Sequence, residues 1–133
     1  MRAGSIWELP HQAGLAHLTA RGILRGAAGR SFEEISKRTD ELGAAISIDA
    51  GREFAEVRLR ALRDDLPELA TMLADALSRP DFPASEVEQV RAEQLGAIAE
   101  SDNDTRATAD RLMRASVNPA PNPLGRRTLG TRE

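Results

Sequence analysis

The chain has 133 residues and a formal net charge of −3, with 41% hydrophobic and 29% charged residues. This length suits one domain with a sizeable core. The acidic balance and the aromatic content of only 3% argue against nucleic acid as a partner, which would need a basic surface and base-stacking side chains. The absence of cysteine excludes disulfides, thiolate zinc sites and a cysteine nucleophile.

The start of the chain, "MRAGSIWELP", lacks the basic head and the apolar run of a signal peptide. No apolar run approaches the about 20 residues of a membrane span, so no membrane partner is expected. A cytoplasmic location is therefore the default expectation, and the compartment of the full assembly stays open.

The first third of the chain predicts a short strand followed by two helices. Residues 1–6 fit an edge strand that a segment with proline and glycine ends. Apolar residues at helical spacing predict a helix over 13–27. Ser31 and Glu34 form a capping box, which opens a second helix. The residues expected to be buried in that helix are Phe32, Ile35 and Leu42.

The pattern then changes to alternation, as in an antiparallel hairpin with one buried face. Ile46 and Ile48 alternate with polar residues in "AAISIDA", and a turn at "GRE" follows. The segment "FAEVRLRAL" alternates less strictly. Its apolar residues are Phe54, Val57 and Leu59.

The second half of the chain predicts two more helices and a tail. Helical spacing over 64–79 places on one side Leu66, Leu69, Leu73, Ala76 and Leu77. A capping box from Ser85 to Glu88 is expected to open the longest helix, which continues to about residue 115 and uses Leu112 as an apolar position. From about residue 118 the chain is rich in Pro, Gly and Arg and reads as an extended tail.

This order of elements predicts an α+β fold with helices packed on an antiparallel β-sheet. A sheet of two or three strands is marginal by itself. We therefore expect residues 1–133 to form a partial domain.

Four segments in this order resemble the M16 (insulinase/pitrilysin) peptidase domain. They are "RAGS…P…AGLAH", "GAAGRSFEEISKRTDELGAAISIDAGREFAEVRLRAL", "LADALSRPDFPASEVEQVRAEQL" and "NPLGRRTLGT". The resemblance spans nearly the whole chain. It implies a LuxS/M16 metallopeptidase-like fold, of which this chain would be the front part, with the second half of the domain following Glu133.

Active members of the family carry the inverted zinc motif H-x-x-E-H, in which the histidines bind the metal and the glutamate activates water. This sequence has "HLTAR" at the matching place. His17 keeps the first position, Ala20 replaces the glutamate and Arg21 replaces the second histidine. A methyl group cannot accept a proton, and a guanidinium cannot bind zinc.

The third metal ligand of active members is a glutamate on a later helix, in a pattern like E-x-x-x-x-E-E-I. When its isoleucine is matched to Ile98, the acidic pair falls at Gly96 and Ala97. Glu93 and Glu100 lie about one helical turn away, and a shifted alignment would bring one of them to this position.

The resemblance therefore implies a catalytically inactive M16-like domain. Such domains pair with an active zinc-peptidase domain or subunit, help to form the substrate chamber and hold a peptide substrate. No catalytic residue, metal ligand or cofactor is expected in this chain, with zinc only in the active partner. The substrate-binding residues are unknown, because the usual clamp would follow Glu133. The alternatives are a stand-alone peptide- or protein-interaction module and a hydrolase that uses unrecognised groups.

Other polar residues have simpler interpretations. His11 and His17 together make a weak two-ligand site, because no carboxylate is placed with them. The alternating oxygens of "ESDNDT" (100–105) lack the glycine and closing glutamate of a calcium loop, so a solvated face or a bend is favoured. The acidic pairs 33–34 and 64–65 fit helix starts. The arginines of the tail are expected to be solvated. They are Arg126, Arg127 and Arg132.

Overall fold

The computed structural model describes residues 3–132. Its α-helices are α1 (Leu15–Gly22), α2 (Phe32–Glu41), α3 (Leu66–Ser78), α4 (Ala84–Asn103) and α5 (Thr105–Val117). Its strands are β1 (Gly26–Ala27), β2 (Arg30–Ser31), β3 (Ala45–Ala50) and β4 (Ala55–Arg60). Short 3-10 helices are η1 (Ser5–Trp7), η2 (Pro10–Gln12), η3 (Ile23–Arg25) and η4 (Pro123–Gly125). The predicted α+β class is confirmed.

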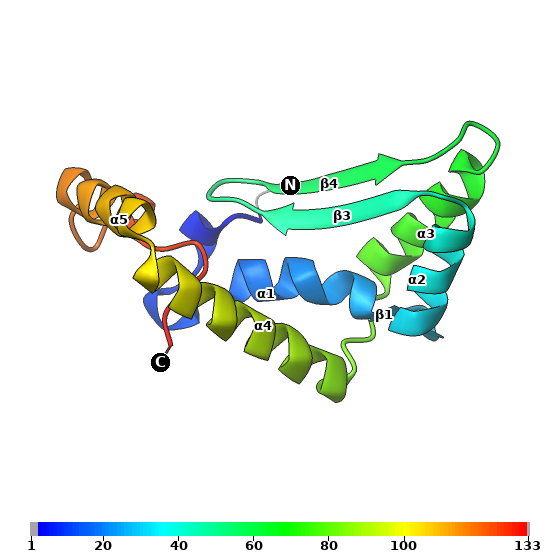
Figure 1. Cartoon of the computed structure of the whole chain (residues 1–133), viewed down its shortest axis with the longest axis horizontal. Coiled ribbons are helices and arrows are strands. Elements are labelled where there is room, and N and C mark those ends of the chain that lie inside the picture. The colour runs from blue at the N-terminus through cyan, green and yellow to red at the C-terminus, as the bar shows by residue number, and fades with distance from the viewer. Residues whose placement is uncertain (1–2, 133) are drawn as a thin grey trace.

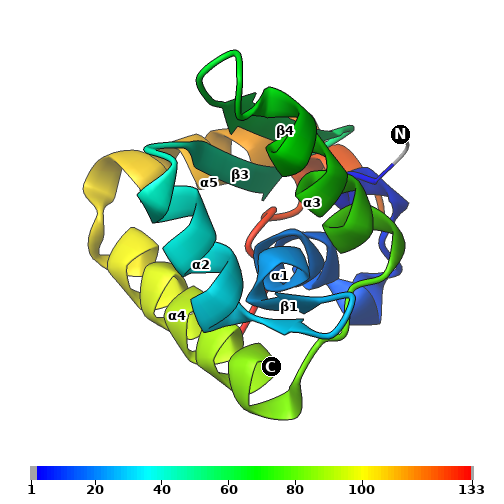
Figure 2. The same ribbon diagram turned by 90° about the vertical axis from the view of Figure 1, so that its right-hand side faces the viewer.

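Helix α1 lies at the centre of the molecule. Figure 1 shows the β3–β4 hairpin along one side of α1 and α4 along the opposite side. In the view down α1, α2 and α3 flank it on either side (Figure 2). Later elements therefore surround α1. One of them, α4, packs against α1 although more than 60 residues separate the two helices along the chain.

The predicted hairpin is confirmed, with the turn at residues 51–54. Strands β3 and β4 pair antiparallel, with Ile48 opposite Val57 and Ile46 opposite Leu59. Only Ile48 is fully buried, at 4% exposure, while Phe54 is 65% exposed. The expectation that Phe54 belongs to a buried face is wrong, because α1 covers β3 and leaves the end of β4 uncovered (Figure 1).

The core forms where α2 and α3 meet the short β1–β2 ladder. Its buried residues are Ala27, Ile35, Leu69, Met72 and Ala76. Leu69 has no exposed surface, whereas Leu66 and Leu77 on the same helix are 45% and 47% exposed. Phe32 was expected to be buried but is 37% exposed, and it lies outside the core cluster with its ring under the guanidinium of Arg25.

Of the two expected capping boxes, the structure contains the one at Ser31 and lacks the one at Ser85. Ser31 Oγ accepts the backbone N–H of Glu34, and the Glu34 carboxylate accepts the backbone N–H of Ser31, at 3.2 and 2.7 Å. That box is confirmed. The box at Ser85 is wrong, because α4 begins at Ala84 with Pro83 as N-cap and without a side-chain cap.

The predicted long helix is two helices. At Asp104 the backbone is extended, and the Asp104 carboxylate accepts the backbone N–H groups of Arg106 and Ala107 to open α5. The bend favoured for residues 100–105 is therefore confirmed. Helix α5 projects to one side of the molecule (Figure 1), and Leu112 is 58% exposed rather than packed as expected.

The expected edge strand at the start of the chain is wrong for the residues that can be described. Residues 1–2 lie outside the described residues, and Ser5–Trp7 form a 3-10 helix. The backbone N–H of Ser5 donates to the carbonyl of Gly51 at 3.1 Å, and that of Ile6 donates to the carbonyl of Arg52 at 2.9 Å. The start of the chain thus docks on the turn of the hairpin without pairing along a strand.

Over residues 118–132 the chain contains no regular element except η4, but it folds back on the molecule. The carbonyl of Leu129 accepts a hydrogen bond from Gln94 at 2.8 Å. Gly130 has a φ of +80° and lies so close to Gly14 that a Cβ at either position would overlap the other segment's backbone. The expectation of solvated tail arginines is wrong for Arg127, whose side chain is only 18% exposed.

Within residues 3–132, no helix combines the length and the apolar character that crossing a membrane requires.

Candidate functional site

The three motif positions lie on α1, whose start is fixed by an acidic side chain. The Glu8 carboxylate accepts the backbone N–H groups of Gly14 and Ala16 at 3.0 and 2.6 Å. These donors have no partner within the helix, and a negative charge at this end also suits the helix dipole. Gly14 is the N-cap with a φ of +96°, a left-handed conformation that glycine adopts without strain.

His17 contacts α4 through a glutamine. Its Nδ1 lies 3.2 Å from Oε1 of Gln94. Nε2 of Gln94 donates to the carbonyls of Gly14 and Leu129, at 3.1 and 2.8 Å. These two bonds orient the amide so that its oxygen faces the imidazole. A carbonyl oxygen only accepts, so Nδ1 of His17 carries the proton. The histidine is thereby held in an ordinary hydrogen bond between two helices.

Arg21, at the second histidine position, faces an acidic side chain of α4. Its Nη2 lies 3.8 Å from Oε2 of Glu93, and both side chains are substantially exposed. Ala20, at the glutamate position, is buried at 5% exposure. A cavity of about 250 Å³ lies between this part of α1 and β3. Its lining includes Ala20, Arg21 and Ser47 and contains no acidic residue.

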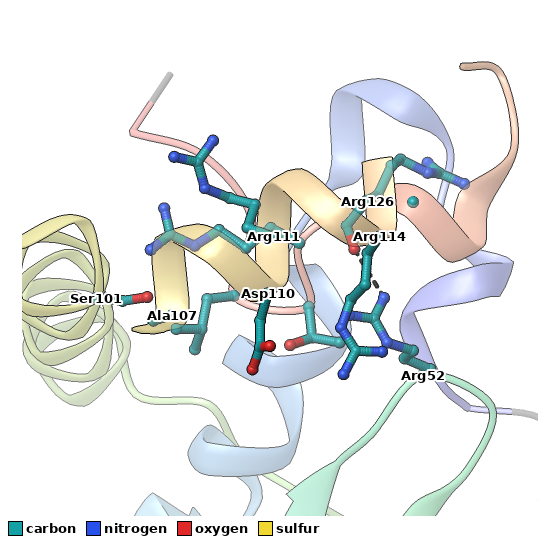
Figure 3. Close-up of a pocket in the computed structure, with 11 residues that line it drawn as sticks. Arg52, Ser101, Ala107, Asp110, Arg111, Arg114 and Arg126 are labelled. Carbon is teal, nitrogen blue, oxygen red and sulfur yellow. Dashed lines mark hydrogen bonds between the residues drawn. The ribbon is translucent and has the colours of Figure 1, made fainter. Parts of the chain in front are cut away.

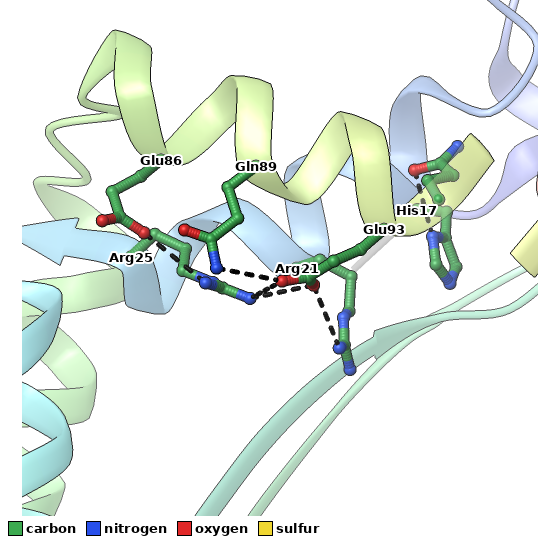
Figure 4. Close-up of polar contacts among 7 residues, drawn as sticks. His17, Arg21, Arg25, Glu86, Gln89 and Glu93 are labelled. Carbon is green, nitrogen blue, oxygen red and sulfur yellow. Dashed lines mark hydrogen bonds and ion pairs between the residues drawn. The ribbon is translucent and has the colours of Figure 1, made fainter. Parts of the chain in front are cut away.

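Arg25 makes the stronger contact with the same carboxylate. Its Nη2 lies 2.9 Å from both oxygens of Glu93, and its Nη1 lies 3.5 Å from Glu86. Its guanidinium also stacks over the Phe32 ring, 4.5 Å from the centroid. Figure 4 shows the polar contacts of Arg25 with Glu93 and Glu86, together with a hydrogen bond from Gln89 to Glu93. Because the Arg25 side chain is only 12% exposed, the Arg25–Glu93 pair is better shielded from solvent than the Arg21–Glu93 pair.

Glu93 and Gln94 are side chains of α4 that make polar contacts with α1. Gly96 is exposed, and the position that its Cβ would take has no neighbour within 4 Å. Ala97 is partly buried and Glu100 is exposed. The assignment of the third ligand position to Gly96 or Ala97 stays a prediction, while Glu93 is the acidic residue of this helix that lies beside the motif.

The residues present do not fit a catalytic zinc ion. Such a site needs about three protein ligands and an open position for water. Here a single imidazole is bonded to an amide, and the nearby carboxylate is bonded to two guanidiniums. Over residues 3–132, no group of three or more histidine or acidic side chains is placed to hold a metal ion.

The other candidates have structural roles. His11 is exposed in η2. Asp102 pairs with Arg127 at 2.9 Å and with Arg132 at 3.6 Å, and Asp104 caps α5, so these two carboxylates of 100–105 are already engaged. Hydrogen bonds from the backbone and hydroxyl of Ser31 hold the pKa of Glu34 below its ordinary value, in keeping with a capping role.

Gln94 and Arg25 were missed from the sequence. Arg21 and Arg25 are four residues apart, and Glu86 and Glu93 are seven apart, so each pair lies on one face of its helix. This opposite-charge pattern could have indicated a contact between the two helices. The hydrogen bonds of Gln94 had no comparable signal, because two of its partners are backbone carbonyls far away in sequence.

Comparison with known proteins settles the family. The model of the family described as insulinase (peptidase family M16) matches residues 1–132. The chain belongs to the M16 peptidase family. As predicted, it is of the type that lacks an intact H-x-x-E-H motif. The crystal structure of a peptidase M16 inactive domain from Pseudomonas fluorescens has the same fold, with a TM-score of 0.86 and 24% identity over 97% of this chain and 31% of that chain.

Two M16 relatives have informative names. The mitochondrial-processing peptidase subunit alpha of Solanum tuberosum is 33% identical over 68% of this chain and 19% of its own length. The non-peptidase homolog YmxG of Helicobacter pylori is 24% identical over 99% of this chain and 30% of its own length. The chain therefore spans less than a third of the length of these relatives.

Proposed function

We propose that this chain is a non-catalytic M16 segment that works with an active M16 zinc-peptidase domain or subunit, helping to form the substrate chamber and to hold a peptide. The observation that carries the proposal is the chemistry at the three motif positions. His17 bonds to a glutamine, Ala20 offers only a methyl group, and Arg21 faces Glu93. These groups supply neither the three protein ligands of a catalytic zinc ion nor the glutamate that activates its bound water in the intact motif.

The names of the relatives support this assignment. One is a non-peptidase homolog and another is a subunit of a processing peptidase. A non-peptidase homolog and a subunit of a processing peptidase therefore both occur among the relatives of this chain. The partner that this chain would need carries an intact H-x-x-E-H and binds the zinc.

The geometry also supports a holding role over a catalytic one. The ligands of an active member would lie where α1 and α4 meet, and here α4 is held next to this place by the pair of Glu93 with Arg25, in η3 directly after α1, at 2.9 Å. A contact of this kind fixes the two helices without a metal. The domain can then keep the shape of an M16 domain while it contributes walls and surfaces instead of reacting groups.

The test is a reconstitution with an M16 subunit from the same cell that has an intact motif. We expect hydrolysis of a fluorogenic peptide by that subunit to increase when this chain is added, and the increase to remain with His17→Ala. A glutamate-to-glutamine change in the partner's H-x-x-E-H motif should abolish the activity in either mixture. Peptide hydrolysis by this chain alone, lost in His17→Ala, would contradict the proposal.

A further inference from the structure

A second cavity, of about 220 Å³, lies on the side of the molecule away from the core. Its walls come from the turn between β3 and β4, the end of α4, one face of α5 and residues 125–129 (Figure 3). Five arginines line it and only one carboxylate does. The arginines are Arg52, Arg111, Arg114, Arg126 and Arg127, and the carboxylate is that of Asp110. This is a strongly positive wall on a chain whose net charge is −3.

Four of these five arginines have no acidic partner within the described part of the chain. The exception is Arg127, which pairs with Asp102 at 2.9 Å. Arg52 donates instead to the backbone carbonyls of Leu124 and Arg126, at 3.0 and 2.8 Å. Arg126 donates through Nη1 to the carbonyl of Glu8 at 3.0 Å. Most of the charge on this wall is therefore not neutralised by residues 3–132.

The arrangement is unfavourable without a further partner. Nε of Arg126 is buried and has no acceptor among the described residues, and an unsatisfied buried donor costs free energy. Burial, with the nearby charge of Arg114, holds the pKa of Arg52 below its ordinary value. Several arginines elsewhere in the chain are paired with carboxylates; Arg38, for example, donates two hydrogen bonds to Glu68 at 2.6 and 2.7 Å. The cavity differs because four arginines without an acidic partner among residues 3–132 line one space, and this grouping points to a negatively charged ligand.

We propose that this cavity binds the carboxylate groups of an acidic polypeptide segment. Guanidinium groups bind planar carboxylates through paired hydrogen bonds, and several together can take a short run of acidic side chains. The lining contains no aromatic residue on which a base could stack, which favours a polypeptide over a nucleic acid. The site is separate from the contact between α1 and α4, and it does not depend on the proposed pairing with an active peptidase.

The test measures binding of a fluorescein-labelled peptide of glutamate and serine residues to the 133-residue chain, by fluorescence anisotropy at low salt. A peptide with glutamine in place of each glutamate is the matched control. We expect the acidic peptide to bind and the glutamine peptide not to, with affinity falling as salt screens the charges. Inorganic phosphate should compete only at much higher concentration than an unlabelled acidic peptide.

Variants on α5 locate the site. Arg111 and Arg114 are exposed, so the double variant Arg111→Gln/Arg114→Gln should fold, which circular dichroism checks, and should bind at least about fivefold more weakly. Asp110→Asn removes the opposing charge and should strengthen binding about twofold. Arg106→Gln, on the same helix but outside the cavity lining, should leave affinity unchanged.

Four results would overturn the proposal. The first is equal binding of the glutamine peptide, and the second is an unchanged affinity of the double variant. The third is competition by phosphate as effective as that by the acidic peptide, which would make this a site for small anions. The fourth is tighter binding of a single-stranded oligothymidylate than of the acidic peptide, which would assign the wall to nucleic acid.

Discussion

The pair of Arg25 and Glu93 should contribute more to stability than the neighbouring pair of Arg21 and Glu93. Both arginines come from the end of α1 or the η3 turn after it, and both face the same carboxylate. Arg25 reaches both oxygens at 2.9 Å with a side chain only 12% exposed. Arg21 reaches one oxygen at 3.8 Å with a side chain 50% exposed. The two pairs thus test how geometry and burial set the strength of an ion pair.

The magnitude follows from these contacts. A paired, partly shielded contact between a guanidinium and a carboxylate is worth about 1–2 kcal/mol of coupling, whereas an exposed single contact is worth about 0–0.5 kcal/mol. Arg25→Met also loses the stack on Phe32, about 0.5–1 kcal/mol, and the contact with Glu86. We therefore expect Arg25→Met to lower the free energy of unfolding by about 2 kcal/mol and Arg21→Met by at most about 0.5 kcal/mol.

The assay is urea unfolding at neutral pH, followed by circular dichroism, in two double-mutant cycles that share Glu93→Gln. The Arg25–Glu93 cycle should give the larger coupling energy, and added salt should reduce the Arg21–Glu93 coupling proportionately more. Equal couplings in the two cycles, or no coupling for Arg25, would refute the reasoning that this pair joins α1 to α4.

Three further predictions concern the core, the last segment and a helix cap. Leu69→Ala should cost about 3 kcal/mol because Leu69 has no exposed surface, and Leu77→Ala, at 47% exposure on the same helix, should cost about 1 kcal/mol or less in the same urea assay. Gly130→Ala should destabilise the chain by more than Gly43→Ala, as thermal unfolding would show. Both glycines have positive φ, but only a Cβ at Gly130 would overlap a backbone carbonyl, while that at Gly43 meets nothing within 4 Å. The lowered pKa of Glu34 means that its charged form stabilises the fold at and above the ordinary value of 4.5, and that this contribution is lost as the pH falls through the lower pKa of the folded state. The stability difference between the wild type and Glu34→Gln should therefore be constant near neutral pH and close on acidification, and a difference that grows in acid would contradict this assignment.

Local signals in the sequence predicted local structure well. The box of Ser31 and Glu34 was readable because both partners lie within one helical turn. The box at Ser85 failed for a local reason too, since Pro83 provides an earlier start and the serine falls inside the helix. The docking of the last segment could not be predicted, because the close approach of Gly130 to Gly14 joins residues more than a hundred positions apart.

The sequence identified the residues at the motif positions, but it did not predict which residues of α4 they contact. The residue types at His17, Ala20 and Arg21 state directly that the motif is incomplete. Helical spacing places the face of α4 only to within about one turn, so it could not choose between Gly96, Ala97 and the nearby Glu93. That choice depends on how far α4 slides along α1, which packing decides.

The measurement that tests the central claim most directly is the zinc content of the purified chain after incubation with zinc and removal of the excess. Elemental analysis of the wild type and of His17→Ala should give the same substoichiometric amount in both, because one imidazole beside two guanidiniums does not make a zinc site. One tightly bound zinc per chain, lost in His17→Ala, would contradict the account of a non-catalytic M16 segment.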